Sequence, residues 1–321
     1  MKEITVVICT RNRYENLKEC INSILKNDEN LYEILIVDQS TDDKTENFVK
    51  NLKNKNIRYI KTDTKGLSRA RNIAILNVKT KYLVFTDDDC IVTESWIEDI
   101  LKEYKKDEKI WGVYGKVLPY GDKSKDEYFC HCLIESDKRS ECSNPVIPHN
   151  YLGHGNNMSF KTEIFKTVGL YNEKLGAGTW MQSGEDTDFI YRVLRKRFKV
   201  IYSPIPTVFH NSWKTMDEAE KLDYGYVKGF VTIFSKYAFK GDFVAIKALV
   251  LRLYQLFKDI FLALRYKNFK KVFTTSKKVF IYFYSIPIGF YFLLCGDPTY
   301  KSMEKKYASI NEMVDTIHLS N

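Results

Sequence analysis

Short apolar runs alternate with helical patterns through the first two thirds of the chain, and this alternation restricts the fold more than any other feature. Short strands bounded by polar turns, and separated by apolar residues at helical spacing, indicate crossover units. The predicted fold is therefore α/β, a Rossmann-like, mostly parallel sheet with helices on both faces. The predicted strands are residues 4–9, 34–37, 57–60, 82–85, 200–202 and 208–210.

Charged and polar side chains directly follow three of these strands. Thr10 and Arg11 follow the first strand, Asp38 follows the second, and residues 87–89 follow the fourth. Ligands of parallel α/β sheets bind beyond the carboxyl ends of the strands. We therefore expect these side chains to meet at one edge of the sheet and to form the functional site.

Three successive aspartates, Asp87, Asp88 and Asp89, carry the clearest chemical signal. Like charges this close repel one another unless a cation lies among them. Mg²⁺ and Mn²⁺ prefer oxygen ligands, and such metals commonly bind through one or two carboxylates plus substrate phosphates. The triplet predicts a site for a divalent metal and a diphosphate. The alternative is a solvated acidic turn, or an N-cap for a helix that starts near Glu94.

Glu185 and Asp186 open a predicted helix that runs toward Arg197. Carboxylates in a first helical turn are stabilised by the helix dipole, which would explain the pair without any function. The functional interpretation makes Asp186 a general base, because a glycine-rich segment precedes it and a metal site is predicted elsewhere.

Two further side chains are candidates only in this context. His210 ends an apolar strand, where a histidine is usually satisfied by its neighbours, but a diphosphate-bound metal needs a further protein ligand. Arg71 lies where a helix is predicted to begin, a place that suits either phosphate or a solvent-facing first turn.

Five motifs occur in the order and spacing of a known protein family. They are residues 6–13, 37–40, 66–72, 85–90 and 184–188. Together they resemble glycosyltransferase family 2, whose members are inverting enzymes of the GT-A fold. The resemblance covers about residues 3–215, and what it implies is carried over only at matched positions.

The resemblance implies a nucleotide-sugar site with a metal. The implied donor-binding residues are Thr10, Arg11, Asp38, Arg71, Asp87, Asp88, Asn156 and Asn157. Within this set Asp38 would contact the nucleobase, and the two asparagines would lie beneath the donor sugar. The implied ligands of Mn²⁺ or Mg²⁺ are Asp87, Asp89 and His210. Asp186 would be the catalytic base, and Glu185 would hold an acceptor hydroxyl.

By this resemblance the chain would transfer a sugar, with inversion, from a nucleoside diphosphate donor such as a UDP-sugar. The acceptor would be a hydroxyl of a glycan or of a polyprenol-linked molecule. A sugar-nucleotide nucleotidyltransferase is the alternative enzyme, but it needs a glycine-rich phosphate loop, and residues 10–13 contain no glycine. A non-catalytic carbohydrate-binding protein of the same fold would not need the acidic residues. A retaining transferase on this fold stays open.

The chain divides by composition into two predicted parts. Residues 1–225 form the predicted catalytic domain, with an irregular loop or lid at 118–150. Residues 226–321 form a basic, aromatic-rich helical tail. Between Lys240 and Lys278 ten Lys or Arg oppose two Asp, so most of the net charge of +9 lies in this stretch.

The tail also contains an uncharged stretch at residues 279–295. Its length lies at the low limit of the roughly 17–25 residues that cross a bilayer. We expect helices that rest on an anionic membrane surface, because basic and aromatic residues are interspersed. A spanning helix, and a helical cap packed on the catalytic domain, are the alternatives.

Seven cysteines without regular spacing favour a reducing compartment over a disulfide framework. A zinc site built from Cys130, His131, Cys132 and Cys142 fits no common ligand spacing, so ordinary thiols are the default. The first apolar run is too short for a cleavable signal peptide. We expect a cytoplasmic protein, peripheral at the inner face of the cell membrane, with no nucleic-acid partner.

Overall fold

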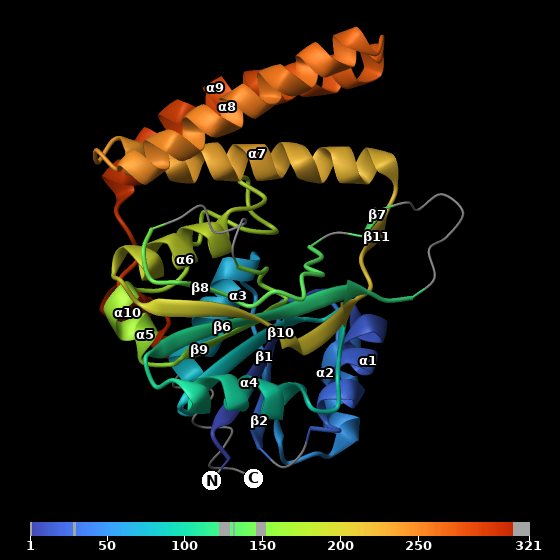
Figure 1. Cartoon of the computed structure of the whole chain (residues 1–321). Helices are drawn as coiled ribbons and strands as arrows, with labels where there is room; N and C mark the ends of the chain where they lie inside the picture. Colours follow the sequence, from blue (N-terminus) through green and yellow to red (C-terminus); the bar gives the residue numbers. More distant parts are fainter. Residues whose placement is uncertain (1, 28–29, 122–128, 131, 146–151, 311–321) are drawn as a thin grey trace.

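The structure, a computed structural model, describes residues 2–27, 30–121, 129–130, 132–145 and 152–310. A nine-stranded sheet lies at its centre, with the order β3-β2-β1-β4-β9-β6-β10-β5 and with β8 paired to β10 (Figure 1). Its strands are β1 Ile4–Thr10, β2 Leu31–Asp38, β3 Ile57–Lys61, β4 Tyr82–Asp87, β5 Cys90–Val92, β6 Ile110–Pro119, β8 Ser140–Cys142, β9 Asn157–Lys161 and β10 Lys199–His210.

Strand register brings the predicted polar residues to one edge of this sheet. β1 lies between β2 and β4 and is parallel to both. Thr10 is paired with Asp38, and Cys9 is paired with Asp87. The three strand ends therefore meet where the strand order changes direction, as ligand sites of α/β sheets require.

The sheet is mixed, because β9 runs antiparallel between β4 and β6, and β5 and β8 run antiparallel to β10. The two strands predicted at 200–202 and 208–210 form the single strand β10, whose register against β6 shifts between Tyr202 and Thr207. The predicted α/β fold is confirmed, with this addition of antiparallel strands.

Helices cover both faces of the sheet because their apolar residues recur on one side. α1 and α4 pack on one face with Ile4, Val6 and Ile8 of β1. α3, α5 and α6 pack on the other face with Val7 of β1 and Leu35 of β2. These helices and α2 have the bounds α1 Tyr14–Ile24, α2 Lys44–Leu52, α3 Leu67–Asn77, α4 Trp96–Lys106, α5 Ile164–Val168 and α6 Glu185–Arg195.

Three long helices form a separate layer above the strand ends (Figure 1). They are α7 Met216–Ala238, α8 Phe243–Arg265 and α9 Phe269–Cys295. A capping box between Thr215 and Glu218 begins α7, and the Asp242 carboxylate accepts from two backbone N–H groups at the start of α8. The predicted boundary between residues 225 and 226 falls inside α7, so this helix belongs to both predicted parts. The division into two domains stays a prediction.

Small residues and buried side chains join the helical layer to the sheet domain. A Cβ on Gly229 of α7 would lie 2.4 Å from Ser183 Oγ, so glycine allows α7 to approach the loop before α6. Ser183 donates a hydrogen bond of 2.7 Å to the carbonyl of Gly225. Tyr191 of α6 packs against Phe234 in a shared apolar cluster. The position of α7 is thus fixed against the loop that precedes Glu185.

After α9 the chain returns to the sheet domain through α10, Tyr300–Lys306, which lies beside α5 (Figure 1). Tyr307 donates a hydrogen bond of 2.7 Å to Glu173, and Lys306 forms an ion pair with the same carboxylate. The helical layer is therefore attached to the sheet domain at both of its ends.

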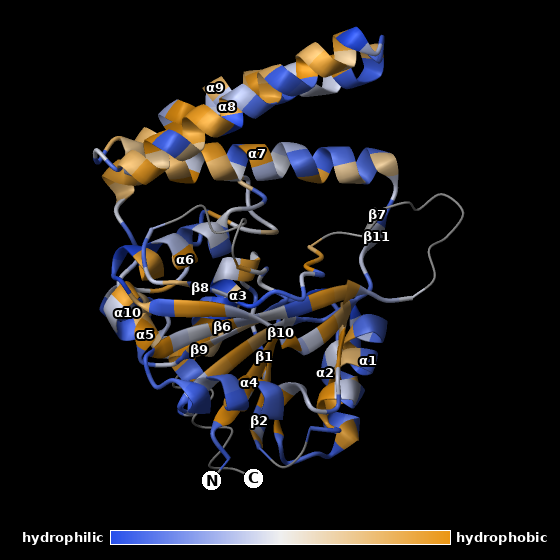
Figure 2. Ribbon diagram, in the orientation of Figure 1, coloured by the Kyte–Doolittle hydropathy of each residue, from blue (hydrophilic) through white to orange (hydrophobic). Residues whose placement is uncertain are grey.

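α8 and α9 contain many apolar residues (Figure 2), and several of their large apolar side chains are exposed to solvent. Phe243 is 85% exposed and Phe280 is 73% exposed. Within the described residues, α9 is long and apolar enough to cross a membrane, and 22% of its most apolar stretch is buried. One such helix is weak support for a span.

The segment predicted as an irregular loop or lid at 118–150 contains two short strands. β8 joins the main sheet, and β7, Phe129–Cys130, pairs with β11, Trp213–Lys214. Residues 122–128, 131 and 146–150 lie outside the described part, so the proposed lid is not described as a whole. His131, one member of the considered zinc set, is among them.

Candidate functional site

The three aspartates at the end of β4 lie in different surroundings. Asp88 accepts a hydrogen bond of 2.7 Å from the Thr10 hydroxyl and forms an ion pair of 2.8 Å with Arg13. Arg13 also pairs with Asp89. Asp87 alone of the three lines the cavity described below, with 35% of its side chain exposed. The sequence predicted their proximity, but it did not predict that Arg13 offsets two of the charges.

Because their surroundings differ, the three carboxyl groups also have different pKa values. Burial raises the pKa of Asp87, and it raises the pKa of Asp88 to about 7 despite the charge of Arg13. Burial acts in the same direction on Asp89, but hydrogen bonding and charge from His210, together with Arg13, bring its pKa down to about 2. Asp89 is therefore the member of the triplet that keeps its negative charge most firmly.

Asp89 and His210 fit a divalent cation. Asp89 Oδ1 lies 3.2 Å from His210 Nε2, close enough for one ion to contact both atoms. A carboxylate oxygen and an imidazole nitrogen are both common ligand atoms of divalent metals. Cys90 lies within the same group because β5 pairs His210 with Cys90. Burial raises the pKa of the Cys90 thiol, so it stays neutral and is a poor ligand for Mg²⁺ or Mn²⁺.

Arg71 joins the metal side of the site to the start of α6. Its side chain is 3% exposed, and its guanidinium pairs with Asp186 and lies 3.8 Å from Glu185 and 3.9 Å from Asp87. The rings of Phe85 and Tyr171 lie over its central carbon at 5.6 Å and 5.3 Å. One buried arginine thus brings three predicted carboxylates together, from the end of β4 and from the first turn of α6.

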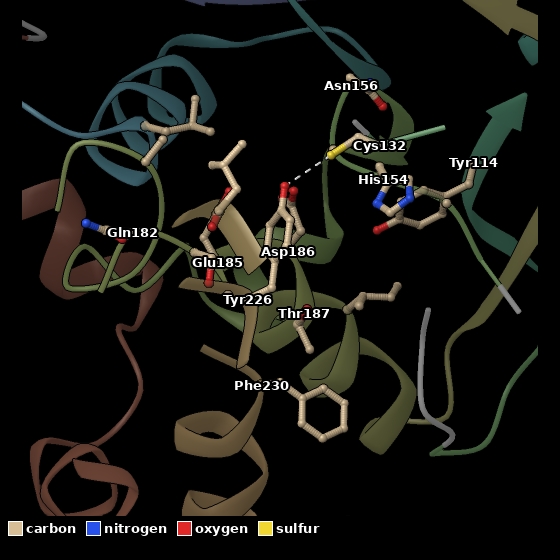
Figure 3. A pocket seen from close by; sticks show the side chains of 18 of the residues that line it. Tyr114, Cys132, His154, Asn156, Gln182, Glu185, Asp186, Thr187, Tyr226 and Phe230 are labelled. Carbon is tan, nitrogen blue, oxygen red and sulfur yellow. Dashed lines mark hydrogen bonds between the residues drawn. The ribbon is translucent and has the colours of Figure 1, made fainter. Parts of the chain in front are cut away.

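The first turn of α6 directs Glu185 and Asp186 into the cavity (Figure 3). Burial raises the pKa of Glu185 to about 8, and the nearby negative charge of Asp186 adds to the shift. Asp186 has 27% of its side chain exposed and is therefore accessible to a ligand. A neutral Glu185 can donate a hydrogen bond, while Asp186 offers an accessible carboxylate oxygen.

The backbone of Gly155 lies close to the side chains of Asp186 and Arg71. A Cβ on Gly155 would lie 2.1 Å from Asp186 Oδ2 and 2.6 Å from Arg71 Nη2. Only glycine fits at this distance without moving the carboxylate. Gly155 was not predicted from the sequence, although the pattern Gly-His-Gly-Asn-Asn contained a signal for it.

Thr10, Arg11 and Asp38 lie at the ends of β1 and β2, as predicted from the strand order. Asp38 is completely buried and accepts hydrogen bonds from the Ser40 amide at 2.7 Å and from the Tyr59 hydroxyl at 2.6 Å. Arg11 is exposed, and its Nε donates to the carbonyl of Gln39 at 3.2 Å. The contact of Asp38 with a nucleobase stays a prediction.

Two neighbouring asparagines have opposite roles in the structure. The amide nitrogen and oxygen of Asn156 are buried without hydrogen-bond partners among the described residues, and Asn156 lines the cavity. The amide of Asn157 donates to the carbonyls of Lys116 and Pro206, and it accepts from Trp96. We therefore assign Asn157 to the sheet rather than to the predicted donor site, and we keep Asn156 as a candidate.

A cavity of about 620 Å³ connects these side chains with the helical layer (Figure 3). Its floor contains Arg71, Asp87 and Asp186. Its walls include His154 from the sheet domain and Tyr226 from α7. The Tyr226 hydroxyl contacts Cys132 Sγ at 3.6 Å, which holds the ring over the cavity. The size suits a small ligand surrounded by a few directed polar groups.

Comparison with known proteins identifies the family. The sequence profile described as glycosyl transferase family 2 matches residues 5–169, just over half of the 321 residues. The chain belongs to glycosyltransferase family 2. The family resemblance stated from the five motifs is thereby confirmed.

Several named glycosyltransferases are similar in sequence. A glucosyl-dolichyl phosphate glucuronosyltransferase of Haloferax volcanii is 24% identical over 181 residues, covering 54% of this chain and 57% of that protein. A pre-mycofactocin glycosyltransferase of Mycobacterium tuberculosis is 23% identical over 230 residues, covering 70% of this chain and 46% of that protein. The glycosyltransferase GlyA of Streptococcus pneumoniae is 27% identical over 139 residues, which cover 19% of its length. These matches therefore span less than two thirds of each relative.

Solved structures show the same fold. The mannosyltransferase PcManGT from Pyrobaculum calidifontis, in complex with GDP-Man and Mn²⁺, has a TM-score of 0.59 at 15% identity. That likeness covers 88% of this chain and 87% of the other. TarS residues 1–349 of Staphylococcus aureus, in complex with UDP-GlcNAc, have a TM-score of 0.55 at 15% identity, covering 72% and 66%. The likeness confirms the predicted GT-A fold.

The structure adds residues to this family 2 site that the sequence did not single out. Arg13 holds two aspartates, Gly155 limits the space around Asp186, and Tyr226 covers the cavity from α7. Arg13 stood within the first motif, so a signal existed. Tyr226 carried none, because its position depends on how α7 packs over the sheet.

Proposed function

We propose that this glycosyltransferase transfers a sugar from a nucleoside diphosphate donor, a UDP-sugar or a similar molecule, to a hydroxyl of a glycan or polyprenol-linked acceptor. The transfer inverts the anomeric centre and depends on Mn²⁺ or Mg²⁺. The observation that carries this proposal is the position of Arg71, whose guanidinium contacts Asp186 and lies 3.9 Å from Asp87 at the floor of one cavity. A base and a diphosphate site are thus adjacent.

Each predicted side chain has a defined task in this reaction. Asp186 accepts the proton of the acceptor hydroxyl while that oxygen attacks the anomeric carbon from the side opposite the leaving group. Glu185, whose pKa is raised to about 8, donates a hydrogen bond to the acceptor. Arg71 offsets the negative charge that grows on the departing diphosphate. The unpartnered amide of Asn156 supports a polar sugar in the cavity.

Asp87, Asp89 and His210 would hold the cation. When bound, a divalent metal supplies Lewis-acid stabilisation to the leaving diphosphate. The GDP-Man and Mn²⁺ complex of PcManGT and the UDP-GlcNAc complex of TarS support a nucleotide-sugar donor for this chain. The Haloferax relative is named a glucosyl-dolichyl phosphate glucuronosyltransferase, and this name supports a polyprenol-linked acceptor.

The tail would hold the enzyme at the inner face of the cell membrane. The exposed aromatic residues of α8 and α9 alternate with lysine and arginine, which suits an anionic leaflet. The expected observation is cosedimentation with phosphatidylglycerol vesicles at low salt and release at high salt. Protein that stays in solution with these vesicles at low salt would exclude the peripheral contact.

The decisive experiment for the reaction is a panel of nucleotide sugars with purified protein. One donor should release nucleoside diphosphate in the presence of Mn²⁺ or Mg²⁺, and EDTA should stop the release. Calorimetry should show that Asp89→Ala loses the metal-dependent part of donor affinity. Unchanged donor affinity in Asp89→Ala would contradict the metal assignment. NMR of the product's anomeric proton decides between inversion and retention.

A further inference from the structure

Cys90 is a buried thiol beside the proposed metal ligands, and the proposed reaction gives it no task. It is the first residue of β5 and is completely buried. β5 runs antiparallel to β10, and Cys90 is paired directly with His210. Directly paired residues of antiparallel strands have their side chains on the same face of the sheet. The strand register therefore brings the thiol of Cys90 to the imidazole of His210.

Asp89 adds a third kind of ligand atom to this pair. It lies in the turn between β4 and β5, next to Cys90 in the sequence. Asp89 Oδ2 pairs with Arg13, whereas Asp89 Oδ1 lies 3.2 Å from His210 Nε2. The carboxylate of Asp89, Cys90 Sγ and the ring of His210 each offer one atom, and these atoms lie within 4.8 Å of one another. One ion placed among them can contact an oxygen, a sulfur and a nitrogen.

The nearby thiol of Cys20 has a different environment. It is also buried, but its Sγ donates a hydrogen bond to the backbone carbonyl of Asp87 at 3.4 Å. Cys20 does not belong to the group formed by Asp89, Cys90 and His210. Of these two buried thiols, only Cys90 is placed to act as a metal ligand.

The three kinds of ligand atom favour one class of ion. Mg²⁺ and Mn²⁺ prefer oxygen ligands, and a thiol adds little to their binding. Zn²⁺ binds cysteine sulfur, histidine nitrogen and carboxylate oxygen in a tetrahedral arrangement. A zinc site with three protein ligands keeps its fourth position open for water or another small ligand. The group around Cys90 has the number and kind of ligands that such a site requires.

We propose that Asp89, Cys90 and His210 form a binding site for a thiophilic divalent cation such as Zn²⁺, with one coordination position left open. The ion binds without a nucleotide donor, because three protein ligands suffice for zinc. When it binds, the S–H bond of Cys90 breaks, a zinc–sulfur bond forms, and the proton passes to solvent. Asp89 and His210 are also proposed ligands of Mn²⁺ or Mg²⁺, so zinc and these ions exclude one another. Cys90 thus determines which class of ion the site prefers.

Co²⁺ binding to the full-length protein, freed of metal by dialysis against a chelator, tests the proposal without any donor. Co²⁺ accepts the same ligands as Zn²⁺, and its bond to a thiolate gives a charge-transfer absorption band in the near ultraviolet. All samples carry Cys295→Ser, because Cys295 is an exposed thiol that could bind metal at the surface. The protein with Cys90 should show the band, and Cys90→Ser should not. Cys20→Ser changes a buried thiol outside the group, so this matched control should keep the band.

The affinities for Zn²⁺ and Mn²⁺ show whether Cys90 is a ligand or only a neighbour. Most protein sites bind Zn²⁺ more tightly than Mn²⁺, so a preference for zinc proves nothing by itself. Cys90→Ser should weaken Zn²⁺ binding by about tenfold or more, since the loss of even an outer-shell partner costs that much. It should change the Mn²⁺ affinity by less than about threefold, because Mn²⁺ does not use the sulfur. Calorimetry for zinc, and the electron paramagnetic resonance signal of free Mn²⁺, measure the two affinities.

A zinc affinity that is the same in Cys90→Ser as in the protein with Cys90 would overturn the proposal. So would a cobalt complex without the sulfur band, or a band that Cys90→Ser keeps. Thermal unfolding checks that each variant folds, and Cys90→Ala replaces Cys90→Ser if the hydroxyl is not tolerated in the core. X-ray absorption at the zinc edge needs no change at Cys90. It should show one sulfur neighbour at about 2.3 Å, and a shell of only nitrogen and oxygen would overturn the proposal.

The zinc site and the proposed sugar transfer can fail separately. The zinc site is measured without a donor, whereas the sugar transfer is measured by the release of nucleoside diphosphate with Mn²⁺ or Mg²⁺. Release of nucleoside diphosphate by a protein that forms no bond between sulfur and metal would overturn only the zinc site. A sulfur band that depends on Cys90, with no donor hydrolysed in the panel, would overturn only the proposed reaction.

Discussion

Helix α6 carries two aspartates, two positions apart, in opposite electrostatic surroundings. Asp186 faces the cavity, where the guanidinium of Arg71 is near three carboxylates. Asp188 faces α7, with 1% of its side chain exposed, and pairs with Arg192 at 2.9 Å and Lys236 at 2.9 Å. The cluster around Asp186 has more carboxyl groups than cations, whereas Asp188 has two cationic partners.

The difference between the two clusters distinguishes a ligand-binding site from an ion-pair network that stabilises the fold. Burial acts to raise the pKa of Asp188, but Lys236 and Arg192 hold it at about 2. Asp297 contacts Lys236 as well and completes that network. At the cavity, by contrast, burial dominates and the pKa of Glu185 is raised to about 8. A buried cluster with more carboxyl groups than cations has capacity for a cationic or hydrogen-bonding ligand, and a balanced cluster stabilises the fold.

The isosteric pair Asp186→Asn and Asp188→Asn should give the largest and most opposed effects. Asp186→Asn should lower kcat by about 10²–10⁴-fold, the usual contribution of a general base, and should leave donor affinity and stability nearly unchanged. Asp188→Asn should lower the free energy of unfolding by about 3–5 kcal/mol, because it leaves buried cations without their partner. Steady-state kinetics and urea unfolding measure the two effects. If Asp186→Asn and Asp188→Asn lost the same free energy of unfolding, the proposed difference between the two clusters would be wrong.

Gly155→Ala tests whether the cavity cluster depends on close backbone approach. The added Cβ would displace the Asp186 carboxylate, so turnover should fall by about 10²-fold, as expected for a shift of about 1 Å in a reacting group. Stability should change little, because the atoms that must move are the ends of side chains. Gly225→Ala, whose Cβ would lie 3.4 Å from Gln182, is the control and should keep its turnover. Full activity of Gly155→Ala would show that Asp186 needs no fixed position.

Glu185→Gln sharpens the comparison through pH. Because the folded-state pKa is raised above the ordinary value for glutamate, the contribution of Glu185 to stability is present at low pH and is lost as pH rises toward about 8. Each pH unit in this window costs at most about 1.4 kcal/mol. Urea unfolding at pH 5 and pH 8 should show a smaller decrease for Glu185→Gln than for the original protein. A parallel decrease in both proteins would place the perturbed group elsewhere.

Much of the sheet and of its polar edge could be predicted from the sequence, because both depend on local patterns. The apolar runs that became β1, β2 and β4 were visible, and their parallel order brought Thr10, Asp38 and Asp87 together. Antiparallel β9 was not predicted, since its pairing with β4 and β6 depends on contacts between distant segments. The single strand β10 was divided into two because Pro204 and Pro206 interrupt its apolar pattern.

The direction in which each side chain of the site points was harder to predict from the sequence than the strands were. Residues 87–89 are chemically identical, and only the turn after β4 decides that Asp87 faces the cavity while Asp88 faces Thr10. Asn156 and Asn157 differ in a similar way, because Asn156 lies in the turn before β9 while Asn157 is the first residue of that strand. The wall formed by α7 and α8 could not be predicted at all, since it depends on contacts such as that of Gly229 with Ser183.

The attachment of the helical layer at both ends has a mechanical consequence. A hairpin joined at one end could swing like a lever, but α7 is held against the loop before Glu185, and the chain after α9 is held at Glu173. The two attachments restrain the ends of the helical layer nearest the reaction centre, while the turn between α8 and α9 projects beyond α7 (Figure 1). If the outer side of this layer rests on a bilayer, the attachments limit how far the lipid can lie from Asp186, so the length of an acceptor matters as well as its chemistry.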